Sequence, residues 1–162
     1  MELKQFADKW CHKDYPPEPV HAEELVATES ELKIRLPADY RQQVLAVGLT
    51  SPTLALLSVI DDLQLDLNDL SSLCTPPEII NQTFKWRAIG MPDHLLVIGD
   101  DCMGNKFCFD MGDLSGDKRS LYAPVYFWDH DFDVTTKIAD SFSVWIESYL
   151  GPWSHGLSAT DF

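Results

Sequence analysis

The sequence predicts a single α+β domain with a largely antiparallel sheet flanked by helices. Helical patterns come first along the chain, strand patterns follow, and a helical pattern closes it. The chain has 162 residues, 45% of them apolar, which is enough for one sizeable core. It contains no internal repeat, and no linker long enough to separate two domains.

The first 20 residues form a leader with a helical pattern of its own. Phe6, Trp10 and Cys11 are spaced to share one helical face, and a proline-rich stretch follows them. Because a free tail would not carry a Trp, we expect residues 1–20 to pack on the domain formed by residues 21–162.

Helices are expected over 22–33 and 37–47. Pro37 suits a first helical position, and Gly48 suits the residue after the last turn. Residues 54–75 allow two interpretations, because 54–60 suits either a buried strand or a short helix and the leucines after it fit either period. A further helix is expected to start at Pro76-Pro77 and to run to Trp86.

Three strands are expected in the last third of the chain, over 95–98, 106–111 and 123–128. In the second of these, large apolar side chains alternate with Cys108 and Asp110. Asp133, Val134 and Thr135 are expected to begin a closing helix whose apolar stripe includes Trp145, which we expect to be a core residue.

The stretch LLVIGDDCMGNKFCFDM, residues 95–111, raises the question of a metal loop. The spacing of its acids fails the EF-hand pattern, and the C-x5-C pair of Cys102 and Cys108 is not a usual zinc spacing. A hairpin fits better, with Met103-Gly104-Asn105 as the turn and the neighbouring acids in solvent. No metal and no cofactor are therefore expected.

The cluster FWDHDFD, residues 127–133, has two interpretations. Its acids around His130 could form a metal or acid–base site, or they could lie in a loop that caps the closing helix, which is the better explanation. The sequence contains no nucleophile elbow, phosphate-binding loop or HExxH motif, so we do not expect an enzyme.

Charge restricts the class of partner. Twelve Lys and Arg oppose 26 Asp and Glu, and residues 51–84 contain no base at all. Such a field repels phosphate backbones, so direct nucleic-acid binding is not expected, whereas a basic protein would be attracted. The sequence has no secretory signal and no apolar run long enough to cross a bilayer. We therefore expect a cytoplasmic location and no membrane association. The four cysteines are then expected to be free thiols.

Taken in order, three blocks of the chain resemble the SUKH superfamily, which includes the Smi/Knr cell-wall-assembly regulators. The first has a Glu-bearing helix with Glu31, an Arg-Leu-Pro joint at 35–37, Asp39-Tyr40-Arg41, and a helix ending at Gly48. The second is the 95–111 stretch. The third combines Pro124-Val125 and 128–131 with Ala139, Ser141-Phe142 and Trp145.

This resemblance implies an α+β domain that binds another protein and catalyses nothing. Bacterial members are mostly immunity proteins that neutralise a toxin, often a nuclease, which would give the acidity a use against a basic partner. A regulatory interaction module with a partner other than a toxin is the alternative. A small metal-dependent hydrolase built on His130, Asp129, Asp131 and Asp101 is a third hypothesis.

The residues expected to contact the partner are acidic and form two groups. The first lies at strand ends that should meet at one rim of the sheet, and the second lies in the base-free stretch. The first group is Asp100, Asp101, Asp129 and Asp131, and the second group is Asp61, Asp62 and Asp66.

Overall fold

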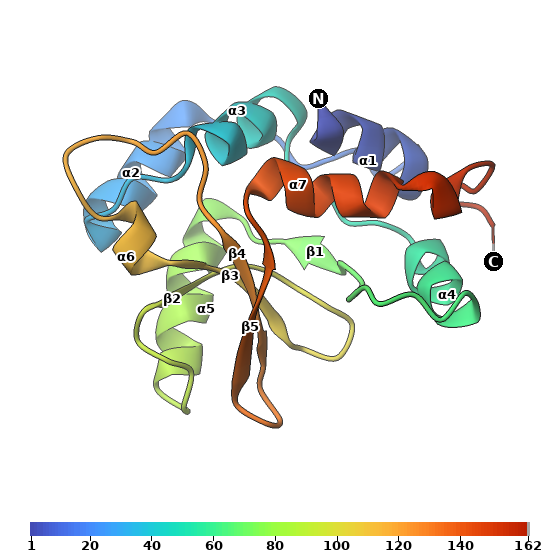
Figure 1. Cartoon of the computed structure of the whole chain (residues 1–162). Coiled ribbons are helices and arrows are strands. Elements are labelled where there is room, and N and C mark those ends of the chain that lie inside the picture. The colour runs from blue at the N-terminus through green and yellow to red at the C-terminus, as the bar shows by residue number, and fades with distance from the viewer. Residues whose placement is uncertain (162) are drawn as a thin grey trace.

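The computed structural model describes residues 1–161 and has a five-stranded antiparallel sheet between helices (Figure 1). The expected α+β class with an antiparallel sheet is confirmed. The helices are α1 (Glu2–Trp10), α2 (Ala22–Leu32), α3 (Ala38–Val47), α4 (Leu54–Asp62), α5 (Pro76–Arg87), α6 (Met111–Leu114) and α7 (Phe142–Glu147). The strands are β1 (Ser72–Leu73), β2 (Leu95–Asp100), β3 (Lys106–Asp110), β4 (Val125–Asp129) and β5 (Val134–Ala139), and two 3-10 turns follow α7 at Ser148–Leu150 and Pro152–Ser154.

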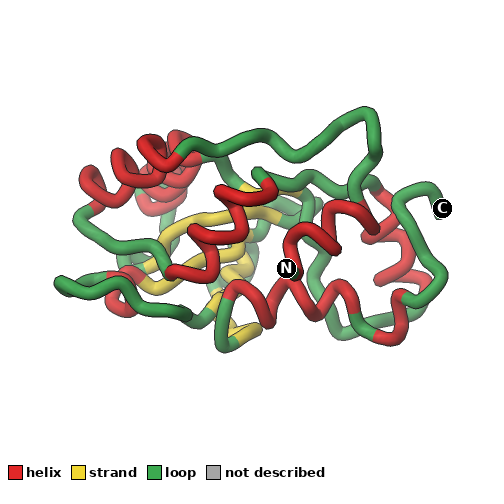
Figure 2. The backbone as a smooth tube through the Cα atoms, turned by 90° about the horizontal axis from the view of Figure 1, so that it is seen from above, coloured by secondary structure: helices red, strands yellow, loops and turns green. Residues whose placement is uncertain are grey.

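The strands lie in the order β1-β2-β3-β4-β5, so each pairs with its neighbour in the sequence. Alternation along β3 divides its side chains between the two faces. Phe107 and Phe109 face the layer of α1, α3 and α7, where Phe109 packs edge-on against Tyr40 with 5.6 Å between ring centroids. Seen from above, the strands lie beneath these helices (Figure 2).

Helix α5 covers the other face, with α2 beside it. The Thr83 hydroxyl accepts a 3.0 Å hydrogen bond from the backbone N–H of Val97, where the β2–β3 register shifts. Trp86, one turn further along α5, packs edge-on against Trp128 of β4. Cys108 points into this side of the core and is fully buried, as a small apolar side chain would be.

The leader forms α1, whose buried residues Leu3, Phe6 and Trp10 join the main core against α3 and α7. The Trp10 indole N–H donates to the carbonyl of Tyr149, 139 residues later, at 3.0 Å. Among residues 1–161, no helix combines the length and the apolar character that crossing a bilayer requires.

The undecided stretch begins with a helix. Thr53 caps α4 by accepting the backbone N–H of Ala55, and the chain then runs irregularly from 63 to 71. Neither the strand nor the helix interpretation of the leucines at 63–70 is right, since residues 63–71 form neither element, although Leu70 is buried.

The expected start of the closing helix at Asp133 is wrong. Residues 134–139 form β5, a strand paired with β4, and α7 begins only at Phe142, where Ser141 accepts the N–H of Val144. The reason lies in the β-branched run Val134-Thr135-Thr136, which fits an extended chain better than a helix. Trp145 is buried, with 2% of its surface exposed, so the prediction that it is core is confirmed.

Candidate functional site: an acidic rim and its groove

Two hairpin turns meet at one end of the sheet. The first joins β2 to β3, with Gly104 at φ +85°, a conformation that glycine adopts without strain. The second joins β4 to β5. His130 of the second turn places its backbone N–H 3.2 Å and its ring Nδ1 2.8 Å from the side-chain oxygen of Asn105 in the first. The expected hairpin at 101–105 is confirmed, and the ends of β2 and β4 share one rim.

Asp101 is the internal cap of the first turn. One carboxylate oxygen accepts the backbone N–H groups of Met103 and Asn105 at 2.9 and 2.8 Å, and the other accepts the Asn105 amide at 3.0 Å. Only 8% of Asp101 is exposed, so the expectation that this acid lies in solvent is wrong. Its short side chain folds back on its own turn because three donors lie within reach there.

Asp100, which precedes Asp101 in the chain, pairs with a lysine. Its carboxylate lies 3.7 Å from the amine of Lys106 and accepts the Ser72 hydroxyl at 3.0 Å. The Lys106 amine also lies 4.7 Å from the ring centroid of Trp86, a cation–π contact that helps to accommodate a buried lysine.

The second turn is organised by Asp129, which accepts the backbone N–H groups of Asp131 and Phe132 at 3.0 and 3.2 Å. Asp133 adopts φ +50° and accepts the Trp128 indole N–H at 2.9 Å, so it stabilises the turn and caps no helix. Asp131 is exposed, and its carboxylate lies 3.3 Å from His130 Nε2.

The second predicted group of acids lies against the first. Asp69, which the sequence analysis did not single out, accepts the backbone N–H of Cys102 at 3.1 Å and so joins the base-free stretch to the β2–β3 turn. Partial burial, followed by the negative charges of Asp69, Asp101 and Asp61, raises the pKa of the Cys102 thiol to about 11. We call the combined surface the acidic rim; it consists of Asp61, Asp62, Asp66, Asp69, Asp100, Asp101, Asp129 and Asp131.

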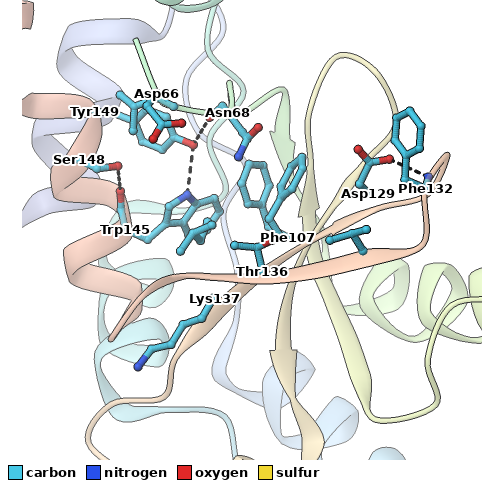
Figure 3. A pocket seen from close by; sticks show the side chains of 14 residues that line it. Asp66, Asn68, Phe107, Asp129, Phe132, Thr136, Lys137, Trp145, Ser148 and Tyr149 are labelled. Atoms are coloured by element: carbon cyan, nitrogen blue, oxygen red, sulfur yellow. Dashed lines mark hydrogen bonds between the residues drawn. The ribbon is translucent and has the colours of Figure 1, made fainter.

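A groove of about 610 Å³ opens beside the rim, between α7, residues 66–68 and the β4–β5 hairpin (Figure 3). Its floor is aromatic: Phe107 packs against Phe127 and against Trp145, with ring centroids 5.3 and 4.5 Å apart. Asp66 and Asp129, one from each predicted group, both line it.

The wall of the groove is fixed by a hydrogen-bonded chain. The Trp145 indole N–H donates to the Tyr149 hydroxyl at 3.1 Å, and that hydroxyl donates to the carbonyl of Asn68 at 2.7 Å. Lys137 points away from the groove in Figure 3, and its amine pairs with Asp140 at 2.6 Å. Lys137 lines the groove together with Asp66 and Asp129, and of these three charged groups the lysine is the one held in an ion pair.

The sequence analysis missed Phe132, Thr136 and Asn68 as groove residues. Phe132 was detectable, since an aromatic residue between Asp131 and Asp133 has little reason to be buried, and it is 78% exposed at the hairpin tip. Thr136 was missed because a helix was predicted where the structure has strand β5.

The groups of the hydrolase hypothesis are held by contacts within and between the two turns. Asp101 and Asp129 accept backbone N–H groups within their own turns, and one ring nitrogen of His130 contacts Asn105. The Cys102 thiol stays protonated near neutral pH and is a poor nucleophile. Across the part of the chain that the structure describes, no cluster of three or more His, Cys, Asp or Glu could hold a metal ion.

A protein-family comparison matches the SMI1 / KNR4 family (SUKH-1) over residues 19–148. The chain belongs to this family. The recognised SUKH resemblance is thereby confirmed, and the match spans every strand and all helices from α2 to α7. A comparison with curated proteins found no match.

The structure assigns physical roles to the SUKH blocks. In the first, the buried acid of α2 is Glu29 rather than Glu31, which is exposed. The Glu29 carboxylate accepts hydrogen bonds from the Arg41 side chain at 3.1 Å, the Arg119 side chain at 2.6 Å and the backbone N–H of Leu36 at 3.0 Å. These bonds hold the α2–α3 joint against the long connection between α6 and β4.

Asp39 of the same block joins α3 to α7. Its carboxylate accepts the backbone N–H of Ser143 at 3.0 Å and the Ser143 hydroxyl at 3.3 Å. Burial raises the pKa of Asp39 above its ordinary value, against the opposing effect of these hydrogen bonds. Gly48 lies so close to the backbone that an added Cβ would be 2.6 Å from the carbonyl oxygen of Glu18.

Proposed function

We propose that this SUKH domain is a non-enzymatic immunity protein that binds and neutralises a basic toxin domain. The observation that carries the proposal is the acidic rim beside an aromatic groove. Eight carboxylates belong to the rim; the buried Lys106 pairs with Asp100, and His130 lies beside Asp131.

The rim is suited to a positively charged protein for a physical reason. Asp101, Asp129 and Asp69 accept backbone N–H groups, which stabilise a carboxylate without cancelling its charge. Asp61, Asp62, Asp66 and Asp131 add exposed charges. Such a field steers an oppositely charged protein toward the rim and repels nucleic acid. A toxin that holds nucleic acid presents a basic surface of the complementary sign.

The binding mode is stoichiometric, because the rim acids serve as hydrogen-bond acceptors and a charged surface rather than as acid–base groups. Elemental analysis of the purified protein is expected to find no stoichiometric metal. One zinc per chain that disappears in Cys102→Ser would overturn this expectation.

The decisive experiment uses the polypeptide encoded next to this gene. It is expressed from an inducible promoter with and without this chain, and growth is recorded. Neutralisation predicts growth arrest alone, recovery on co-expression, and a complex of the two chains on size exclusion. If the neighbour binds but its expression never harms the cell, the domain is a regulatory module instead.

A further inference from the structure

Strand β5 ends the sheet with an open edge. Within residues 1–161 the sheet order stops at β5, and no other strand pairs with its outer side. An antiparallel edge strand leaves alternate N–H and C=O groups pointing outward, where another strand can pair with them. Residues 134–137 are exposed, and the hairpin extends beyond the helices in Figure 1.

This edge lacks the usual protection near the hairpin tip. Edge strands are commonly blocked by proline, by lysine or by a bulge. In β5, Lys137 and the register shift opposite Val125 lie toward the Ala139 end. The tip half is Val134-Thr135-Thr136, uncharged and rich in β-branched residues that favour strand pairing.

The groove lies on one face of this same strand. Thr136 pairs with Phe127 and Val134 with Asp129, so both face the groove, whereas Thr135 pairs with Trp128 on the opposite face. A strand added to β5 would therefore place every second side chain beside the aromatic floor. Phe132 at the tip offers a further apolar contact.

Charge identifies the occupant. Asp66, Asp129 and Lys137 line the groove, and the Lys137 amine is paired with Asp140. Asp131 and Asp133 flank Phe132. An extended segment with basic side chains fits this environment. A second copy of this chain fits it poorly, because two molecules of formal net charge −14 repel each other.

We propose that the outer edge of β5, with the groove beside it, binds an extended basic segment of the partner as an additional strand of the sheet. Main-chain hydrogen bonds to the edge provide affinity, and the groove selects alternate side chains. That the partner is a toxin rests on the proposed function; the strand-addition mode does not.

The test compares two threonines on one strand. Thr136→Lys puts a positive charge on the groove face, where it opposes the basic side chains of a bound segment. Thr135→Lys makes the same change of charge on the opposite face. Thermal unfolding first establishes that both variants fold as the native protein does.

The probe is a synthetic peptide of about ten residues that alternates lysine and valine, a length typical of a long strand. Titration into isotope-labelled protein is followed by amide chemical shifts. We expect shifts in residues 134–138, with binding about tenfold weaker in Thr136→Lys and little changed in Thr135→Lys. Absent binding, shifts that spare β5, or equal weakening in both variants would overturn the proposal.

A second arm separates this proposal from the proposed function. If the neighbouring toxin is neutralised equally well by both variants, the immunity function stands and strand addition is wrong. If the peptide behaves as expected but no toxin is neutralised, strand addition stands and the immunity function is wrong. A β5-dependent homodimer in sedimentation, lost in Thr136→Lys, would replace the basic partner with a second copy.

Discussion

Buried carboxylates have different roles in two regions of this molecule. At the α2–α3 joint, Glu29 is held by Arg41 and Arg119, so its charge is neutralised within the fold. At the rim, Asp101 is as buried as Glu29 but is held by amide groups of its own turn, so its charge is not neutralised. The partners of an acid, rather than its burial, decide whether it fastens the structure or contributes to an external field.

Packing beneath the groove gives the largest expected effect. Trp145 contacts Phe107, Phe142 and Tyr149 and forms part of the groove. Trp145→Ala should cost about 3–5 kcal/mol of unfolding free energy, because it leaves a cavity in a close-packed core. Denaturant unfolding measures this. A variant with unchanged stability would mean that Trp145 serves the groove and not the core.

The fastening role of Glu29 is tested by Glu29→Gln. The amide cannot satisfy both arginines, and a loss of about 2 kcal/mol is expected, less than for a fully buried pair because both arginines are partly exposed. Glu31→Gln makes the same change of charge at an exposed position two residues further along α2. It is the matched control and should change stability by less than about 0.5 kcal/mol. Equal losses would contradict the contrast between the two regions.

The external field of the rim is tested by replacing Asp61, Asp62 and Asp131 together with Asn. Asp101 is left intact because it caps its turn. Association with the neutralised toxin should slow several-fold, on the order of 1 kcal/mol in barrier, and native association should slow as the Debye length falls from about 10 Å at 0.1 M salt to about 3 Å at 1 M.

The control for this variant removes three exposed acids elsewhere, Glu23, Glu31 and Asp117, so that net charge changes equally. Stopped-flow rates distinguish the two. If both triple variants slow association alike, or if salt has no effect on the native rate, the rim acids contribute to solubility only.

Asp69 gives the smallest expected effect. Burial raises its pKa above the ordinary value of about 4, so the folded protein holds this proton more tightly than the unfolded chain does. The resulting stability is fully present below pH 4 and is lost as the pH rises through the raised pKa. Asp69→Asn avoids that loss and should be more stable than the native protein at pH 7, by less than about 1 kcal/mol.

Melting temperatures measured across about pH 4 to 7 test this prediction, and the two curves should converge at the acid end. Asp66→Asn is the matched control, because Asp66 is exposed and its replacement makes the same change of charge. If the melting temperatures of the native protein and of Asp69→Asn change with pH in the same way, folding does not disfavour the charged form of Asp69.

The sequence by itself determined the elements whose signals are local. Turn chemistry at Gly104, alternation along β3 and Thr75-Pro76-Pro77 with Glu78 in a capping box each depend on neighbours within a few residues. It also determined the acidity, and the opposite chain direction of successive strands was enough to place Asp100 and Asp129 at one end of the sheet.

Only the tertiary structure decided what the acids do. Whether residues 134–139 form a strand depends on pairing with β4, and whether Glu29 or Glu31 is buried depends on Arg119, 90 residues away. Asp69 reaches Cys102 from across a loop, and Asp66 meets Asp129 only over the groove. These contacts join distant parts of the chain, and their free energies arise on folding, so no local pattern of residues contains them.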